Sequence, residues 1–263
     1  MNGNGTADWD AERRFGGLRR LHGDAGYARI RAARIAVVGL GGVGSWAAEA
    51  LARSGVAALV LIDLDHVVES NINRQVQALG ATLGMAKAEA LRTRVHDIHP
   101  GCAVTTIEEF ASAENWPALL GGATVDALID ACDQPRAKVA LAAWSRASGV
   151  PLVVAGAAGG KRLPQAVAVA DLAEVTHDPL LGSLRQRLRK EHAAPRTGPI
   201  GVRCVFSRES VHRPAAAGEG ADCAIDGSLN CHGYGSSVTV TATFGMVAAA
   251  EALRLVEGAS API

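Results

Sequence analysis

Three glycines in one short stretch have the spacing of a phosphate-binding turn. Gly39, Gly41 and Gly44 form the pattern G-x-G-x-x-G around Gly42, and Asp63 follows. The first glycine of such a turn permits the bend, the second lets a phosphate approach the backbone, and the third lets a helix pack on a strand. The helix N-terminus attracts the phosphate, and a carboxylate about twenty residues later binds ribose hydroxyls. The pattern predicts a nucleotide site; glycines that serve only a turn are the alternative.

Cations downstream of the glycines favour a triphosphate over a dinucleotide. Arg74 and Lys87 lie in the same stretch as the polar residues Asp65, Asn71 and Gln75. Backbone N–H groups handle the pyrophosphate of NAD without such a pair, whereas Arg and Lys stabilise the charge that develops when pyrophosphate leaves ATP. We therefore expect all five side chains at an ATP site, with Arg74 and Lys87 catalytic. An NAD-dependent dehydrogenase is the alternative.

Two further carboxylates follow the predicted strand 125–130. Asp130 ends that strand, and Asp133 lies three residues later. Ligands of such folds bind at the carboxyl ends of the strands. We expect Asp133 to hold Mg²⁺ on phosphate oxygens and to be catalytic. For Asp130, contact with the nucleotide and a cap at the strand end are two open readings.

Strands that alternate with helices must position these groups. The sequence predicts an α/β fold: a Rossmann-like, doubly wound, mainly parallel sheet with a long, partly mobile C-terminal loop region and a C-terminal helix. We expect a single domain over 13–257, between a flexible N-terminus at 1–12 and a tail at 258–263, with the loop region at 177–235. The predicted strands are 34–38, 59–63, 103–107, 125–130 and 151–155, with a sheet extension at 165–171, and the predicted helices are 19–31, 45–54, 85–97, 136–148 and 180–191.

The charges sum to zero but are unevenly distributed. The chain has 263 residues, and its 26 Lys and Arg balance its 26 Asp and Glu. Arginines gather in 13–34, acids in 63–133 and bases in 161–213. A neutral total excludes a histone-like polycation but does not exclude nucleic acid as a partner.

The cysteines and the apolar segments indicate the compartment. The five cysteines are an odd number, and no two have C-x-x-C spacing, which disfavours a disulfide framework and a zinc ribbon. Residues 1–10 contain no apolar signal core, so we expect a cytoplasmic protein. The apolar segment 238–256 contains Glu251 and Arg254, which are costly in lipid, and we expect a buried helix there.

Taken together, the motifs resemble the ubiquitin-activating-enzyme-like superfamily, which includes the adenylating enzymes of molybdopterin and thiamin biosynthesis. Within it, the chain is most similar to the tRNA threonylcarbamoyladenosine dehydratase branch. The motifs shared with the superfamily are Gly39-Leu-Gly-Gly-Val-Gly44, Asp63-x-Asp65, Asn71-x-x-Arg74-Gln75, Lys87 and Asp130-x-x-Asp133. Those that favour the branch include Arg14-Phe-Gly-Gly17, Gly156-Ala-Ala-Gly-Gly160 and Cys204-Val-Phe-Ser207.

The resemblance implies a reaction, cofactors and partners. A threonine carboxylate on a modified adenosine of tRNA would be adenylated by ATP with Mg²⁺, and the group would then cyclise. It implies Asp63 on the ribose, Asn71, Arg74 and Lys87 on the phosphates, and Asp133 at magnesium. A monovalent cation, Na⁺ or K⁺, at 156–160 is a further expectation. The expected partners are tRNA carrying threonylcarbamoyladenosine, a second copy in a homodimer and a cysteine desulfurase system, but not DNA.

Several assignments have competing readings. The molybdopterin and thiamin relatives have an arginine that reaches into the partner subunit where this chain has Gly17, and Arg14 or Arg20 would have to substitute. Cys204 and Cys231 are either packing residues or nucleophiles. We expect the basic face of helix 180–191 to follow tRNA phosphates. Its residues are Arg185, Arg187, Arg189 and Lys190.

The rival functions come from different classes. One is an enzyme that adenylates the C-terminus of a ubiquitin-like sulfur-carrier protein; such an enzyme could use one of its own cysteines as a nucleophile. Another is an inactive scaffold for a cysteine desulfurase system. Pyrophosphate release separates them, because the dehydratase requires modified tRNA, the activator requires a small protein, and the scaffold releases none.

Overall fold

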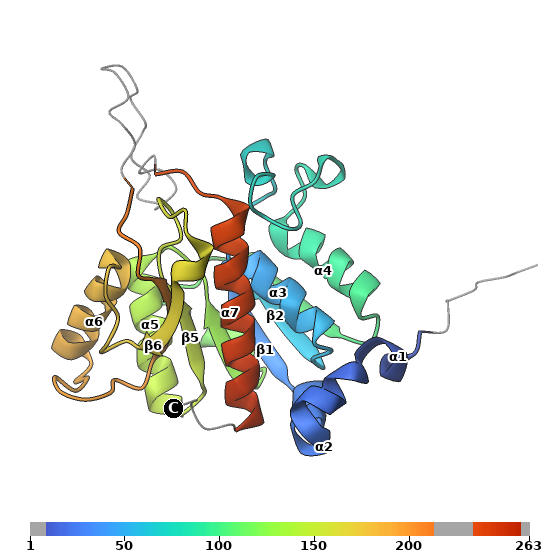
Figure 1. The fold of residues 1–263 in the computed structure, drawn as a ribbon, viewed down its shortest axis with the longest axis horizontal. Helices are drawn as coiled ribbons and strands as arrows, with labels where there is room; N and C mark the ends of the chain where they lie inside the picture. Colours follow the sequence, from blue (N-terminus) through green and yellow to red (C-terminus); the bar gives the residue numbers. More distant parts are fainter. Residues whose placement is uncertain (1–8, 213–233, 259–263) are drawn as a thin grey trace, which may run out of the picture.

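The computed structural model describes residues 9–212 and 234–258. Its centre is a seven-stranded sheet in the order β3-β2-β1-β4-β5-β7-β6, in which only β6 runs antiparallel to its neighbour (Figure 1). The strands are β1 (Arg34–Val38), β2 (Ala58–Ile62), β3 (Ala103–Ile107), β4 (Ala127–Asp130), β5 (Leu152–Ala155), β6 (Val167–Asp171) and β7 (Arg203–Ser207). The predicted mainly parallel, doubly wound sheet is confirmed.

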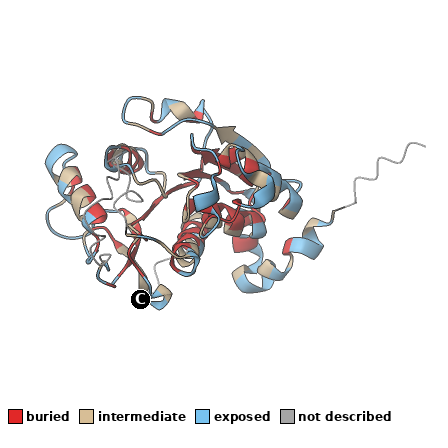
Figure 2. Cartoon of the chain, turned by 90° about the horizontal axis from the view of Figure 1, so that it is seen from above, coloured by how far each residue is buried: buried red, intermediate tan, exposed pale blue. Residues whose placement is uncertain are grey.

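Helices cover both faces of this sheet, which explains why its central strands are continuous apolar runs. Seen from above, buried strands lie between two layers of helices (Figure 2). One layer contains α3 (Gly44–Arg53), α4 (Lys87–Ile98) and α7 (Val238–Glu257), and the other contains α5 (Pro135–Ser148) and α6 (Pro179–Glu191). The helices α1 (Ala11–Phe15) and α2 (Gly17–Ala32) precede β1, and four 3₁₀ turns lie at Glu69–Asn71, Gly80–Thr82, Ala118–Leu120 and Pro164–Ala166.

Alternation along each strand separates the two cores. In β1, Ile35 and Val37 face the layer of α3 and α7, whereas Ala36 and Val38 face the layer of α5 and α6. All four side chains are buried. Each strand therefore stabilises both layers, and its carboxyl end is fixed at a common edge of the sheet.

Two predictions about irregular segments need correction. The expected long loop 177–235 contains α6, as predicted, but also β7, which lies inside the sheet between β5 and β6. The segment is short and closely preceded by prolines, and its pairing with β5 is a long-range contact that no local pattern reveals. Of the predicted flexible N-terminus 1–12, residues 1–8 lie outside the described residues, and α1 begins at Ala11, where Asp10 caps it through the N–H groups of Glu12 and Arg13. The predicted tail lies outside the described residues except for Gly258.

The apolar C-terminal segment is a core helix. By length and composition alone α7 passes as a membrane span, but half of its most apolar window is buried. Phe244 and Ala248 are fully buried against the sheet, and the helix lies beside α3 (Figure 1). The burial is that of a helix packed inside a globular protein.

Candidate functional site

A pocket of about 340 Å³ opens at the carboxyl ends of β1, β2, β4 and β5. Its floor includes Val38 and Ile62, the last residues of β1 and β2. Of the residues predicted for the nucleotide, the magnesium ion and catalysis, most line this pocket. They are Gly39, Gly41, Gly42, Asp63, Asp65, Asn71, Arg74, Gln75, Lys87 and Asp133. Two predicted residues, Gly44 and Asp130, do not line it.

The glycine turn has the geometry that the spacing predicts. Gly39 has a φ of +84°, and a Cβ there would lie 2.7 Å from the backbone nitrogen of Cys132. A Cβ on Gly44 would collide with the carbonyl oxygen of Gly39, so α3 can begin close to β1 only with glycine at that position. A Cβ on Gly41 would meet no atom within 4 Å, which leaves the backbone there open to a ligand.

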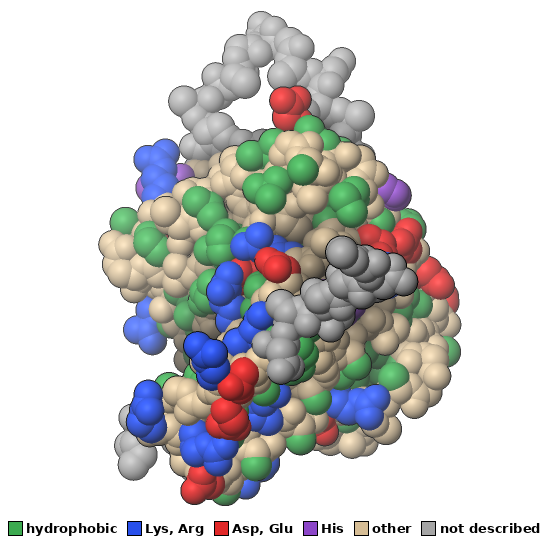
Figure 3. All heavy atoms as spheres, turned by 90° about the vertical axis from the view of Figure 1, so that its right-hand side faces the viewer, with side chains coloured by type: hydrophobic (Ala, Val, Ile, Leu, Met, Phe, Trp, Pro, Cys, Tyr) green, Lys and Arg blue, Asp and Glu red, His purple; other side chains and the backbone are tan. Residues whose placement is uncertain are grey.

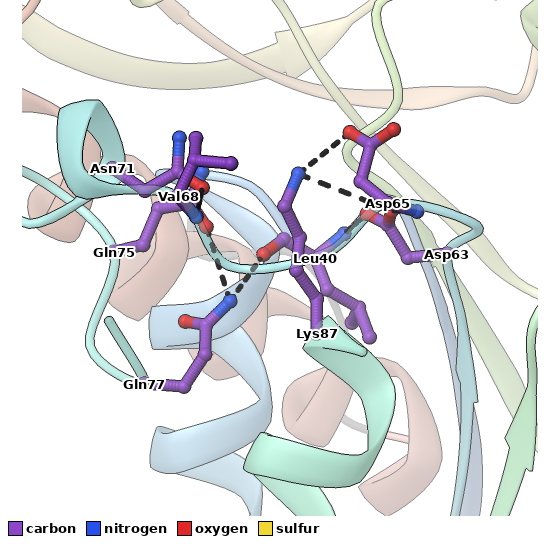
Figure 4. Close-up of polar contacts among 8 residues, drawn as sticks. All are labelled: Leu40, Asp63, Asp65, Val68, Asn71, Gln75, Gln77 and Lys87. Carbon is purple, nitrogen blue, oxygen red and sulfur yellow. Dashed lines mark hydrogen bonds and ion pairs between the residues drawn. The ribbon is translucent and has the colours of Figure 1, made fainter. Parts of the chain in front are cut away.

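Asp63 is held by one backbone N–H of the glycine turn and one of its own loop. Its two carboxylate oxygens accept hydrogen bonds from the N–H of Leu40 (2.6 Å) and of Asp65 (2.9 Å) (Figure 4). Burial raises the pKa of Asp63, and the nearby ammonium of Lys87, 4.0 Å away, opposes this effect. The carboxylate is therefore fixed in place at the pocket wall, ready to accept hydroxyl donors.

Lys87 brings a buried positive charge to the same wall. It begins α4, is 6% exposed, and its Nζ donates a 2.7 Å hydrogen bond to Asp65 Oδ2 (Figure 4). The backbone N–H of Lys87 also donates to the carbonyl of Asp65, at 2.9 Å. Asp65 is exposed while Lys87 is buried, so an anionic ligand that enters the pocket would compete with the exposed carboxylate of Asp65 for the ammonium.

Asn71, Arg74 and Gln75 lie on the turn that faces the glycines. Asn71 accepts from the N–H of Val68 at 3.1 Å, and Gln75 accepts from Gln77 Nε2 at 3.1 Å (Figure 4). Arg74 donates to the carbonyl of Ser70, and its pKa is lowered by burial. Arginine stays charged despite such a shift, so Arg74 is a fixed cation at the pocket.

Asp130 and Asp133 occupy different environments although they are three residues apart. Asp130 is fully buried, and its Oδ1 accepts from Lys138 Nζ and from the N–H of Cys132, both at 3.1 Å. This arrangement matches the strand-end reading of Asp130. Asp133 lines the pocket and is partly exposed.

The acidic side chains suit a magnesium ion that is held mainly by a ligand. No group of three His, Cys, Asp or Glu residues that could cage a metal occurs within 9–212 and 234–258. Mg²⁺ typically uses one or two carboxylates together with substrate phosphates and water. Asp133 at the pocket supplies such a carboxylate.

The pocket also has walls that the sequence did not predict as nucleotide-binding. Phe110 is 52% exposed and lines it beside Glu109, directly after β3. Ser236, just before α7, and Thr241, in its first turn, reach it from more than a hundred residues after Asp133, the last residue predicted for the nucleotide or magnesium. An exposed phenylalanine after a strand is a usable sequence signal, whereas nothing local marks Ser236 or Thr241. Residues 156–159, considered before only for a cation, line it as well.

The basic residues predicted for RNA are partly used inside the protein. Arg185 donates to the carbonyls of Leu172 and Val175, at 3.0 and 2.9 Å, and Arg189 donates to the carbonyl of Pro195 at 3.1 Å. Arg187 is half-buried and Lys190 is exposed.

The arginines at the N-terminus are also engaged within their own chain. Arg14 donates to the carbonyls of Asp97 and Ile98 at the end of α4. Arg19 pairs with Glu12 and Asp24, each at 3.0 Å. The space-filling view of this side shows blue and red side chains intermingled (Figure 3). Arg14 and Arg19 are therefore engaged within the chain, while Arg20 is exposed.

Of Cys204 and Cys231, the two cysteines with competing interpretations, the structure describes only Cys204. Cys204 is fully buried in β7, and burial raises the pKa of its thiol. A buried neutral thiol is a poor nucleophile, so the packing reading holds for Cys204. Burial also raises the pKa of Cys132 at the pocket, and the carboxylate of Asp130 adds to the shift. Cys231 lies outside the described residues.

Comparison with known proteins gives a consistent result. A model described as the ThiF family matches residues 14–262. The chain is 42% identical over 250 residues to the tRNA threonylcarbamoyladenosine dehydratase of Escherichia coli (strain K12), covering 92% of each chain. It is 36% identical over 188 residues to that of Bacillus subtilis (strain 168), covering 72% of each. The solved structure of the E. coli enzyme with ATP matches with a TM-score of 0.83 and 41% identity, covering 94% of this chain and 95% of that chain.

Proposed function

The chain belongs to the ThiF family, and we propose that it uses ATP to cyclise threonylcarbamoyladenosine in tRNA, next to the anticodon, with loss of one water. The observation that carries this proposal is the similarity to tRNA threonylcarbamoyladenosine dehydratases over nearly the whole chain, together with a pocket lined by the predicted ATP-binding residues. The E. coli relative has been solved with ATP and with AMP, which fits both ends of an adenylation step.

The reaction proceeds by making the carboxylate a better electrophile. An oxygen of the threonine carboxylate attacks the α-phosphorus of ATP, and pyrophosphate leaves. A nitrogen of the same threonylcarbamoyl group then attacks the activated carbonyl carbon and AMP leaves with the carboxylate oxygen. The second step is intramolecular, and well-held groups of this kind reach effective molarities of about 10⁵ M or more. No covalent bond to the protein is needed, in keeping with the buried thiol of Cys204.

The pocket residues have separate roles in this proposal. Asp63 binds the ribose hydroxyls, and Gly41 lets the phosphates approach the backbone. Asn71 contacts the phosphates, and Arg74 and Lys87 stabilise the charge that develops on the leaving pyrophosphate. The buried, fixed positions of Asp63 and Lys87 support these assignments, because preorganised charges need little rearrangement at the moment of reaction.

Magnesium and the partners complete the proposal. Asp133 would hold Mg²⁺, which neutralises phosphate charge, and a monovalent cation at 156–160 remains a prediction. We propose a cytoplasmic homodimer. Arg20 is the better candidate for a residue that reaches the partner subunit, because Arg14 is bound to its own α4. A cysteine desulfurase partner remains a prediction.

The test is a reaction with purified protein, ATP, Mg²⁺ and threonylcarbamoylated tRNA, read by pyrophosphate release and by nucleoside mass spectrometry. The wild type should release pyrophosphate and yield a nucleoside lighter by one water. Lys87→Ala and Asp133→Ala should each lower the rate at least about 100-fold, since each removes charge stabilisation of the transition state. Glu174→Ala, at the opposite edge of the sheet, is the matched control.

The outcomes separate the candidate functions. Release that requires a small ubiquitin-like protein instead of tRNA would establish the sulfur-carrier activator. No release with either substrate would favour the scaffold. Full activity of Lys87→Ala or Asp133→Ala would refute the roles given to these residues.

A further inference from the structure

The carboxyl edge of the sheet carries opposite charges at its two ends. Near β2 and β3, Glu69, Glu108 and Glu109 are exposed. Near β7 and β6, the exposed charges include Arg162 and Arg208. The pocket opens between these ends, because it is lined by Glu109 on one side and by residues 156–159 on the other. A polyanion that reaches the pocket meets repulsion from the first side and attraction from the second.

One carboxylate joins the loops that carry the two arginines. Oε2 of Glu209 accepts hydrogen bonds from the backbone N–H groups of Arg162 and Leu163, both at 2.9 Å. Lys161 Nζ donates to the carbonyl of Glu209, and Glu209 directly follows Arg208. The loop after β5 and the end of β7 therefore form one connected unit, and Arg162 and Arg208 lie on it together.

The positive charges of this unit outnumber the nearby acids, because Lys161, Arg162 and Arg208 stand against Glu209 and Asp178. Glu209 is 9% exposed and also accepts from His212 Nε2 at 2.9 Å. Asp178, the other acid nearby, is 6% exposed and accepts from the N–H groups of Ala157 and Leu181. Within the part of the chain that the structure describes, the guanidinium groups of Arg162 and Arg208 have no partner.

The unit is adjacent to the pocket along the chain. Gly159 lines the pocket, and Arg162 follows three residues later, which is at most about 10 Å of backbone. By contrast, α6 begins at the pocket with Leu180 and runs away from it, so Lys190 lies about 15 Å along the helix. Arg185 and Arg189 on α6 are bound to carbonyls, as described above.

We infer that Arg162 and Arg208, here called the basic rim, bind backbone phosphates of the RNA loop that presents the modified nucleotide to the pocket. The inference rests on the proposed function and assigns the RNA surface to a different place from α6. Phosphate contacts at the rim position the RNA, while the acidic end keeps the rest of the loop away from the nucleotide side. Selection of the modified base belongs to the pocket.

Three double variants that each remove two positive charges test the rim. They are Arg162→Ala with Arg208→Ala at the rim, Arg187→Ala with Lys190→Ala on α6, and Arg29→Ala with Arg34→Ala away from the pocket. Affinity for threonylcarbamoylated tRNA is measured at several salt concentrations, without turnover. Nucleotide-dependent thermal shift with ATP confirms that each variant is folded and has an intact pocket.

The rim variant should lose at least about tenfold in tRNA affinity, and the slope of log affinity against log salt should fall by about 1.4, since each phosphate of a single strand contributes about 0.7. The other two pairs should change affinity by less than about threefold. An unchanged affinity and slope for the rim variant would overturn the inference, as would a larger loss in the α6 pair. tRNA binding and pyrophosphate release are measured separately. A wild-type protein that binds tRNA but releases no pyrophosphate would therefore count against the proposed function and not against the rim.

Discussion

At the scale of single residues, two aspartates at the carboxyl ends of β2 and β4 have different environments. Asp63 follows β2 and lines the pocket, whereas Asp130 ends β4 and is fully buried beneath it. The difference comes from Lys138 on α5, whose ammonium is itself fully buried and donates to Asp130 and to the carbonyl of Ala155. Burial opposes the charge of Lys138, yet the attraction of Asp130 is strong enough to raise its pKa. The pair holds the ends of β4 and β5 together under the site.

Breaking this pair should be costly. Lys138→Met removes the ammonium and leaves the carboxylate of Asp130 buried without a counter-charge, so we expect a loss of about 3–5 kcal/mol in the free energy of unfolding. Urea unfolding measures it. Arg92→Met is the control, because its ion pair with Glu89 is partly exposed and should contribute less than about 1 kcal/mol.

A second substitution separates charge from packing. Adding Asp130→Asn to Lys138→Met removes the uncompensated charge and should recover part of the lost stability. A Lys138→Met protein as stable as the Arg92→Met control would contradict a structural role for the buried pair.

At the scale of elements, the site depends on how α7 crosses α3. A Cβ on Gly245 would collide with the carbonyl oxygen of Val43 and lie 2.7 Å from Cβ of Trp46, so the two helices touch at this glycine. The contact fixes the start of α7, from which Thr241 reaches the pocket. α7 thus contributes to a site whose other residues lie between Val38 and Leu180, apart from Ser236 just before the helix.

Replacing a glycine by alanine should have opposite effects on the free energy of unfolding in two of the helices. Gly245→Ala forces α7 away from α3 and should destabilise the protein by about 1–3 kcal/mol. Gly182→Ala in α6 meets no atom within 4 Å and should stabilise by about 0.5–1 kcal/mol, because alanine favours helix more than glycine does. Thermal and urea unfolding compare them. A neutral Gly245→Ala would mean that the close helix contact is absent in solution.

At the scale of the whole molecule, the net charge of zero conceals a separation of acidic and basic side chains along the carboxyl edge of the sheet, where the pocket opens. Acidic side chains gather near β2 and β3, and the basic rim lies near β7 and β6, with the pocket between them. This order follows from the strand order, since β2 and β7 lie four strand positions apart in the sheet. The acidic and basic blocks that are separate along the sequence are therefore also separate along the carboxyl edge of the sheet.

Ligand-dependent stability of the whole chain discriminates the two nucleotide classes. At a concentration of about 100 times the dissociation constant, ATP with Mg²⁺ should stabilise the protein by about 2.7 kcal/mol, and NAD should give no comparable shift. Thermal unfolding with each nucleotide measures this, with Lys87→Ala as the variant expected to lose the ATP effect. A larger stabilisation by NAD would refute the triphosphate assignment.

Features of this protein that depend on local spacing can be read from the amino-acid sequence. Strand and helix alternation predicted the doubly wound sheet, and G-x-G-x-x-G predicted the turn, because positive φ at Gly39 and the close approach at Gly44 require glycine. Parallel strands bring their carboxyl ends to one edge, so residues that follow strands, such as Asp63 and Asp133, could be expected at one pocket.

Contacts between distant segments cannot be read from local spacing and emerge only on folding. The pairing of β7 with β5 and the arrival of Thr241 at the pocket join residues far apart in the chain. The same holds for the carboxylate of Glu209, which unites two loops into the basic rim. Spacing along a chain fixes turns and periodic faces, but burial and charge pairing depend on which segments pack together, and packing is a property of the folded whole.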